Sequence, residues 1–426
     1  MNRHAAHAPA PEFARVFGYL AGSAAVPDIE GKQRLLTALS IDTLGVGMFL
    51  PLAFYFFTVS TSMPMGGIGL TISCATFAAL LLAPVGGVLT DRYGARSMVV
   101  TSNLLSAAGY LLYPAASTYT GIFFCVLLVM MGDRLYFASW PTLIARIARP
   151  DQLTGWFSLV QSINAGCSGV GSLMSTLVLA SSGAPAVKSI VVANACTSVI
   201  AATLTATQNF GSPVASTRPA SLSPWLALHN PLFRRLLLAQ LLIATAWTIP
   251  GTFLPLYLTK TLDLPHWSTT LASATNYLLI FLLQLRVTHY LRHIARIRVI
   301  TLGIGLLLAS LCIIAVAMPL AEPGIAAIIV ATGVVIYTIG EMFVLPSTYA
   351  LVSAISTNET RGRYMSLFQM TGAVAFGIGP GMVGFLFEIS PLTVLLVVSA
   401  LTGCGALVIH SSRDIYCPQG VTLSDG

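Results

Sequence analysis

The sequence predicts an all-α polytopic membrane protein with 12 transmembrane helices in two pseudo-symmetric six-helix bundles. The prediction depends on composition, on the length and spacing of the apolar stretches, and on an internal repeat. Of 426 residues, 56% are hydrophobic and 8% are charged, whereas soluble domains carry about 25% charged residues. A water-soluble fold could not bury this much apolar surface, so the chain is expected to span a lipid bilayer repeatedly.

Apolar stretches of roughly 20 residues or more follow one another along the chain, and each is long enough to cross ~30 Å of hydrocarbon. We place them at 35–58, 67–89, 97–116, 119–146, 154–180, 185–206, 232–258, 267–290, 298–319, 324–352, 362–387 and 391–411. The chain is thereby divided into a tail at 1–32, a six-helix bundle at 33–207, a linker at 208–230, a second six-helix bundle at 231–411 and a tail at 412–426.

An internal repeat supports two equivalent halves. Three short segments of the first half recur in the same order in the second half. They are Gly47–Leu52 and Gly251–Leu256, Gly132–Asp133 and Gly340–Glu341, and Ser158–Gln161 and Ser366–Gln369. Halves related by an axis along the membrane normal place a substrate site between them, near the middle of the bilayer.

The distribution of positive charge predicts the orientation of the chain. Arginines gather in the tails and in alternate loops, whereas the other loops keep little beyond Lys188 and Lys260. Because loops rich in Lys and Arg stay on the cytoplasmic side, both termini are expected in the cytoplasm, with the protein in the plasma (inner) membrane. The arginines on the expected cytoplasmic side are Arg92, Arg96, Arg146, Arg149, Arg218, Arg234, Arg235, Arg286, Arg292, Arg296, Arg298, Arg361, Arg363 and Arg413.

The loop between the second and third spans carries a specific motif. It reads Gly87-Val-Leu-Thr-Asp91-Arg92-Tyr-Gly94-Ala-Arg96 and joins two apolar helices through a very short turn. An ordinary positively charged loop would need the arginines but not the Gly/Asp/Gly frame. The motif meets every specified position of G-x-L-x-D-R-x-G-x-R, and so it resembles the loop signature of the major facilitator superfamily of secondary transporters.

The resemblance implies that this motif acts as a conformational latch. Asp91 is then expected to approach the N-terminus of the eleventh helix near Thr360 and Arg361, where the helix dipole and a cation both favour an anion. The corresponding loop of the second half, Leu285–Arg298, lacks the Gly/Asp/Gly frame. A latch in the second half would therefore use other residues.

Four ionisable residues lie inside predicted spans: Asp42, Asp133, Arg134 and Glu341. Each costs about 2.5–3.5 kcal/mol or more in hydrocarbon, so each is expected to face an interior or a wet cavity. Burial favours the neutral form of a carboxyl group, which allows Asp and Glu to exchange protons near neutral pH. Arg134 stays charged and needs an anion, for which Asp42 is the better partner because Asp133 points about 100° away around the helix.

These charged residues have two interpretations. An arginine in the fourth span recurs in the superfamily in connection with proton coupling, and Arg134 resembles it in position and surroundings. We therefore predict that Asp42, Asp133, Arg134 and Glu341 act in proton coupling or substrate contact. The alternative is a buried ion pair that only holds helices together.

Glycines and a proline in the eleventh span predict a hinge. They are Gly377, Gly379, Pro380 and Gly384, and they can kink the helix or permit close helix packing. The fifth span has glycines at the matching place but no proline. Drug–proton antiporters of the superfamily usually show a Gly-Pro pair in that span, so its absence leaves the direction of transport open.

Aromatic residues of several spans are candidates for a broad apolar substrate pocket. The ones we select are Tyr55, Tyr136, Trp140 and Trp247.

The predicted function is proton-coupled export of amphipathic organic molecules, such as drugs or secondary metabolites, by alternating access. The alternatives are a proton symporter that imports a small solute, a non-transporting membrane sensor or scaffold, and a membrane hydrolase. The chain has no GxxxxGK[ST], G-x-S-x-G or HExxH motif, and so we expect no enzyme, no cofactor and no metal. The expected partners are the lipid bilayer, protons and a small organic substrate, without nucleic acid, and the protein is expected to be a monomer.

Overall fold

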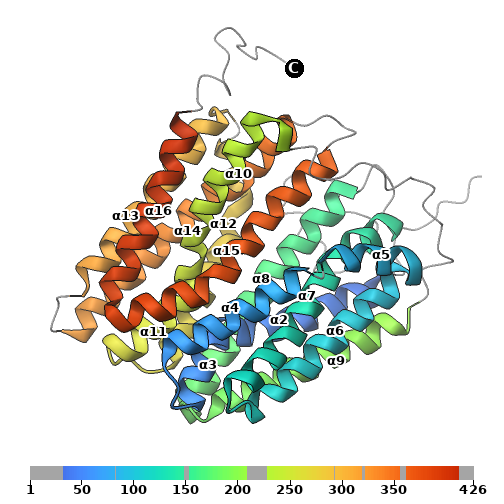
Figure 1. Ribbon diagram of the computed structural model, residues 1–426, viewed down its shortest axis with the longest axis horizontal. Coiled ribbons are helices and arrows are strands. Elements are labelled where there is room, and N and C mark those ends of the chain that lie inside the picture. The colour runs from blue at the N-terminus through green and yellow to red at the C-terminus, as the bar shows by residue number, and fades with distance from the viewer. Residues whose placement is uncertain are drawn as a thin grey trace, which may run out of the picture.

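The predicted spans fold as helices in a computed structural model (Figure 1), which describes residues 32–81, 83–147, 153–208, 228–291, 293–318, 322–355 and 361–411. Helices are expected because a segment in hydrocarbon must satisfy its backbone N–H and C=O groups internally. The first half contains α2 (Gln33–Phe49), η1 (Leu50–Leu52), α3 (Ala53–Ser60), α4 (Met65–Leu81), α5 (Ala83–Tyr93), α6 (Ala95–Leu112), η2 (Tyr113–Ala115), α7 (Tyr119–Ile147), α8 (Leu153–Ser182) and α9 (Ala186–Ala206).

The second half repeats this order. It contains α10 (Pro231–Ala244), η5 (Thr245–Trp247), η6 (Ile249–Phe253), α11 (Leu254–Leu256), η7 (Tyr257–Thr261), α12 (Trp267–Leu291), α13 (Arg296–Val316), α14 (Pro323–Ala354), α15 (Arg361–Ile389) and α16 (Pro391–His410). Among the described residues, 9 helices are long and apolar enough to cross a membrane. The three other predicted spans correspond to α4–α5, α6 and α12, so the count of 12 transmembrane helices stays a prediction.

The first and seventh spans both depart from a regular α-helix. A 3-10 turn at η1 contains Pro51 and separates α2 from α3. In the seventh span, the 3-10 turn η5 is followed by the π-helical segment η6, which contains Pro250. Proline removes a backbone donor and disturbs the regular ladder, so Pro51 and Pro250 explain these irregular segments. Pro255, which matches Pro51 in the repeat, lies in α11 directly after η6.

Each half forms its own bundle. In the first bundle, α2 packs against α8 and α9, and α6 packs against α7 and α9; in the second, α10 packs against α15 and α16, and α13 against α14 and α16. Figure 1 shows the blue-to-green helices of the first half beside the yellow-to-red helices of the second half. The pairing of helices is therefore equivalent in the two halves, as the sequence repeat predicted.

Two long helix pairs join the bundles, namely α4 with α15 and α8 with α12. We use "terminal end" for the end of the molecule at which α2 begins and α16 ends, and "opposite end" for the end at which α3 ends and α4 begins. The bundles meet closely at the opposite end, where the Gly66 N–H donates to Glu388 Oε1 at 2.8 Å and Tyr55 Oη lies 2.6 Å from His266 Nδ1.

Small residues allow the close approach of α4 and α15. A Cβ on Gly69 would overlap the Pro380 carbonyl oxygen, and a Cβ on Gly384 would lie 2.6 Å from the Met65 carbonyl oxygen. The Gly381 N–H also donates to Ser73 Oγ at 2.9 Å. Small-residue packing of this kind is typical of helix contacts within membranes.

Candidate functional site

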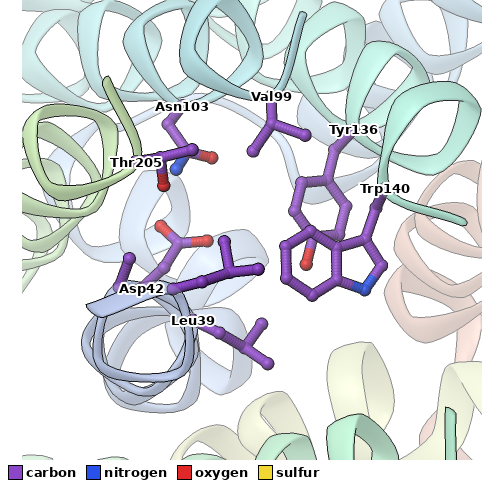
Figure 2. A pocket seen from close by; sticks show the side chains of 9 residues that line it. Leu39, Asp42, Val99, Asn103, Tyr136, Trp140 and Thr205 are labelled. Carbon is purple, nitrogen blue, oxygen red and sulfur yellow. The ribbon is translucent and has the colours of Figure 1, made fainter. Parts of the chain in front are cut away.

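Asp42 lies in a small pocket inside the first bundle, with room for about one water molecule. Figure 2 shows its carboxylate directed toward the side chains of α6 and α9. Ser198 Oγ of α9 donates a hydrogen bond to Asp42 Oδ1 at 2.9 Å. The pocket is lined by Leu35, Ala38, Leu39, Asp42, Val99, Asn103, Tyr136, Trp140 and Thr205.

A glycine one turn after Asp42 explains why Ser198 can reach the carboxylate. A Cβ on Gly45 would overlap Thr197 Oγ1 and would lie 2.7 Å from Asn194 Oδ1. The absence of that Cβ lets the backbone of α2 approach α9 closely. The Asp42 carboxylate is then held by a hydroxyl group instead of a cation, which leaves its charge uncompensated by any salt bridge among the described residues.

The expected ion pair between Asp42 and Arg134 is not formed. The Arg134 guanidinium instead lies over the ring of Phe137, 5.7 Å from its centroid. Asp133, the preceding residue of α7, interacts electrostatically with both Asp42 and Arg134. Among the described residues, Asp133 is the residue of α7 that interacts with Asp42, and Arg134 follows it about 100° further around the helix.

Glu341 belongs to a separate polar cluster in the second bundle. Asn276 Nδ2 on α12 donates to Glu341 Oε2 and to Thr338 Oγ1, each at 3.0 Å. The structure therefore divides the four ionisable residues between the bundles, with three in the first bundle and Glu341 in the second.

Sequence reasoning missed Ser198 and Asn276, the hydrogen-bond partners of these carboxylates. Both are uncharged polar residues inside apolar spans, where a polar side chain needs a partner. The sequence thus shows polar residues inside apolar spans, but many other Ser, Thr and Asn residues share this property. Only the structure shows which of them reach Asp42 and Glu341.

The loop motif forms the tight turn that the sequence predicted. Gly94 alone separates α5 from α6, and its φ of 85° is a left-handed value that favours glycine. Arg96 donates to the Ala206 carbonyl oxygen at the end of α9, and Arg92 lies over the ring of Tyr93. Gly87 lies within α5. The side chains of Asp91 and Arg361, and Thr360 altogether, lie outside the described residues, so the expected latch stays a prediction.

The predicted hinge residues of α15 lie at contacts. Gly377 faces the ring of Phe77 on α4, Pro380 and Gly384 face α4 as described above, and a Cβ on Gly379 would overlap Thr248. The helix runs from Arg361 to Ile389 with Pro380 inside it. Close packing is therefore present at these residues, whereas hinge motion stays a prediction.

The four candidate pocket aromatics lie in three different surroundings. Tyr136 and Trp140 stack with ring centroids 5.5 Å apart beside Asp42. Tyr55 is buried and bonds His266 at the opposite end. Trp247 lies in the second bundle, where its ring is 6.3 Å from that of Phe376.

Nine helices among the described residues are long and apolar enough to cross a membrane, which indicates an integral membrane protein. In the comparison with known protein families, the model of the Major Facilitator Superfamily matches residues 35–380. The chain belongs to this family, and it is a secondary transporter and not an enzyme.

The curated relatives resemble part of the chain. The multidrug resistance protein MdtH of Shigella flexneri is 28% identical over 149 residues, which is 35% of this chain and 37% of that protein. MdtH of Escherichia coli matches to the same extent. The matched region thus spans little more than a third of the length of these relatives.

Solved structures share the fold over nearly the whole chain. A mutant form of the nucleoside transporter NupG has a TM-score of 0.75 at 15% identity, covering 89% of this chain and 99% of its own. A bacterial homologue of the iron transporter ferroportin in its inward-facing state has a TM-score of 0.72 at 14% identity, covering 90% of this chain and 98% of its own. The same homologue in its outward-facing state has a TM-score of 0.61.

Proposed function

We propose that this transporter exports amphipathic organic molecules in exchange for protons, by alternating access between its two bundles. The observation that carries the proposal is the placement of Asp42. Its carboxylate is held by Ser198 beside Asp133 inside a membrane-spanning bundle. A carboxylate enclosed in this way, with a hydroxyl group and no cation paired to it among the described residues, is suited to take up a proton on one side of the membrane and release it on the other.

Export is supported by the partial similarity to MdtH, whose name describes multidrug resistance. Import of a small solute by proton symport is the second candidate, because the structural neighbours include a nucleoside transporter. The two candidates share the proton site and differ in the direction of substrate movement.

We further propose that the terminal end faces the cytoplasm of the inner membrane and that the structure is an inward-facing state of a monomer. Contacts between bundles at the opposite end support this proposal, as does the higher TM-score with the inward-facing homologue than with the outward-facing one. In this state Asp42 would exchange protons with the cytoplasm.

Growth of cells with and without expression of this protein is first measured in the presence of a panel of toxic amphipathic compounds. A compound that inhibits the expressing cells less is taken as the substrate for the direct test. Uptake of that compound into everted membrane vesicles is then measured with and without an imposed pH gradient. We expect gradient-dependent uptake that is lost in Asp42→Asn and kept in Asp263→Asn, because Asp263 lies exposed in the loop before α12. If the pH gradient drove accumulation of the compound in right-side-out vesicles but not in everted ones, import by proton symport would be favoured. Uptake insensitive to the gradient, or unchanged in Asp42→Asn, would refute the coupling site.

The other site residues are tested in the same assay. Arg134→Ala and Asp91→Asn are expected to abolish uptake while the protein still inserts into the membrane. Normal uptake in both variants would refute their assignment to coupling and gating.

A further inference from the structure

Two polar side chains at the Asp42 pocket are buried without a hydrogen-bond partner among the described residues. Asn103 of α6 is 7% exposed and Thr205 of α9 is 2% exposed, and both line the pocket. By contrast, the hydroxyl of Thr203, on the same helix as Thr205, bonds the Val199 carbonyl oxygen at 2.9 Å. Burial of an amide or hydroxyl group without a partner is unfavourable. Both side chains are therefore expected to bond a molecule that occupies the pocket.

The directions of the helices bring these groups together at Asp42. Side chains of a helix lean toward its N-terminus, and α2 begins at the terminal end whereas α9 ends there. Asp42 therefore leans toward the terminal end, and Thr205, in the last turn of α9, leans toward Asp42. Figure 2 shows Asn103 and Thr205 together beside the carboxylate. Asp42 Oδ1 accepts from Ser198, and Oδ2 accepts from no other described residue, so Oδ2 is the acceptor for the occupant.

The size and the polar groups of the pocket favour water over a metal cation. The pocket has room for about one water molecule, and a buried water makes about three hydrogen bonds. Asp42, Asn103 and Thr205 supply three polar groups. Bound Ca²⁺ or Mg²⁺ takes about six or more oxygen ligands, and the rest of the wall is apolar apart from Tyr136 and Trp140, whose rings stack on each other.

We propose that Asn103 and Thr205 hold a water molecule against Asp42, and that this water carries the proton between Asp42 and the terminal end through the interior of the first bundle. On release, the water accepts the proton from Oδ2 and gives one of its own to the Thr205 hydroxyl, which passes a proton to solvent at the terminal end. The carboxylate is left charged, and the water and the hydroxyl regain their original protonation. Uptake of a proton follows the reverse order.

Asn103 and Thr205 are positioning residues in this scheme, and the inference rests on the proposed function because it supplies the path of the coupling proton. Both are uncharged, so replacing them removes hydrogen bonds without changing the charge near Asp42. Among the described residues, the ionisable groups that interact electrostatically with Asp42 are Asp133 and Tyr136 on α7 and Tyr110 on α6.

Infrared difference spectroscopy of the purified full-length protein in lipid tests for the water without a transport substrate. Spectra at mildly acidic and mildly alkaline pH are subtracted, in ordinary water and in water enriched in the heavy oxygen isotope. A carboxyl band that is absent from Asp42→Asn belongs to Asp42 and not to Asp133. We expect an O–H stretching band that shifts with the isotope and changes when Asp42 loses its proton, because a hydrogen bond to a charged carboxylate is stronger than one to a neutral carboxyl group.

Variants assign this band to the pocket. The band should be lost in Asn103→Leu and Thr205→Val, because a buried water needs polar partners, and kept in Thr205→Ser, which retains the hydroxyl. Thr101→Val on α6 and Thr203→Val on α9 are the matched controls, since both residues are exposed and bond carbonyl oxygens of their own helices. Both controls should keep the band. A spectrum without an isotope-sensitive band, or the same band in Asn103→Leu and Thr205→Val, would overturn the proposal.

Transport separates a proton relay from a structural role of the same residues. With the compound selected by growth inhibition, Asn103→Leu and Thr205→Val should slow gradient-driven uptake at least about tenfold. Exchange of labelled for unlabelled compound across the vesicle membrane should keep its rate in both variants, because exchange requires no net release of protons. Thr205→Ser, Thr101→Val and Thr203→Val should match the unmodified protein in both measurements.

The outcomes distinguish the relay from the function on which it rests. Uptake that depends on Asp42 but keeps its rate in Asn103→Leu and Thr205→Val would overturn the relay and leave proton-coupled transport intact. Uptake unchanged in Asp42→Asn would overturn both. Equal loss of uptake and exchange in the two pocket variants would overturn the relay and assign Asn103 and Thr205 a structural role.

Discussion

Gly94 shows how one residue fixes the turn between two membrane-spanning helices. Its N–H donates to the Thr90 carbonyl oxygen at 2.9 Å, and its carbonyl oxygen accepts from the Met98 N–H at 3.2 Å. Both helices therefore continue up to this residue, and the change of direction falls on Gly94 alone. A side chain at its φ of 85° would be strained.

We expect Gly94→Ala to lower the free energy of unfolding by about 1–3 kcal/mol, because alanine resists this backbone conformation. The measurement is chemical denaturation of the purified protein in detergent. Gly305→Ala is the control, since a Cβ on Gly305 meets nothing within 4 Å. Equal stability of Gly94→Ala and the unmodified protein would contradict the structural role of the turn.

Arg96, which belongs to the loop motif, also caps the C-terminus of α9. Its guanidinium donates to the Ala206 carbonyl oxygen at the C-terminus of that helix, where unpaired carbonyl groups and the helix dipole favour a cation. We expect Arg96→Ala to cost about 1 kcal/mol of stability, with partial recovery in Arg96→Lys. Thermal unfolding in detergent compares the three proteins, and a midpoint unchanged in Arg96→Ala would exclude the capping role.

Among the elements, the contact between α4 and α15 decides how the bundles meet at the opposite end. Gly66 and Ser73 of α4 bond Glu388 and Gly381 of α15, and Gly69 lies directly against Pro380. The contact has little tolerance for added volume, because backbone atoms and not flexible side chains lie opposite Gly69.

We expect Gly69→Leu to push α4 away from α15 and shift the protein toward states that are open at the opposite end. Spin labels at Ser62 and Pro265, in a background without native cysteines, report the separation of the bundles there. Their distance distribution should move to larger values in Gly69→Leu. Gly403→Leu is the control, since nothing lies within 4 Å of a Cβ on Gly403, and equal distributions in both variants would refute the prediction.

For the whole molecule, the distribution of arginines predicts one orientation in the membrane. Arg92, Arg96 and Arg296 lie at the terminal end, whereas Lys260 lies at the opposite end. Moving positively charged loops across a membrane is unfavourable, and so the terminal end should face the cytoplasm.

Fusion reporters test this orientation in cells. Alkaline phosphatase fused after Asp263 should be active, because this loop is expected outside the cytoplasm, and the same enzyme fused after His410 should be inactive. Green fluorescent protein should give the reverse pattern at the two sites. Active phosphatase after His410 would place the terminal end outside and would also reverse the proposed direction of proton movement.

The sequence by itself determined the helical class, the placement of most spans, the tight turn at Gly94 and the equivalence of the two halves. These properties follow from local rules: apolar length, backbone hydrogen bonding in hydrocarbon and the conformational freedom of glycine. The repeated Leu-Pro-Leu segments form the 3-10 turn η1 in the first span and the short helix α11, between η6 and η7, in the seventh.

Only the tertiary structure decided which side chains meet. Asp42 is bonded by Ser198 and not paired with Arg134, and the glycines of α15 lie against α4. These contacts join residues far apart in sequence, and they depend on the rotation of each helix about its axis. Neighbouring residues of a helix point in directions about 100° apart. The rotation of each helix is fixed by its packing against neighbouring helices, and the sequence alone does not specify that packing.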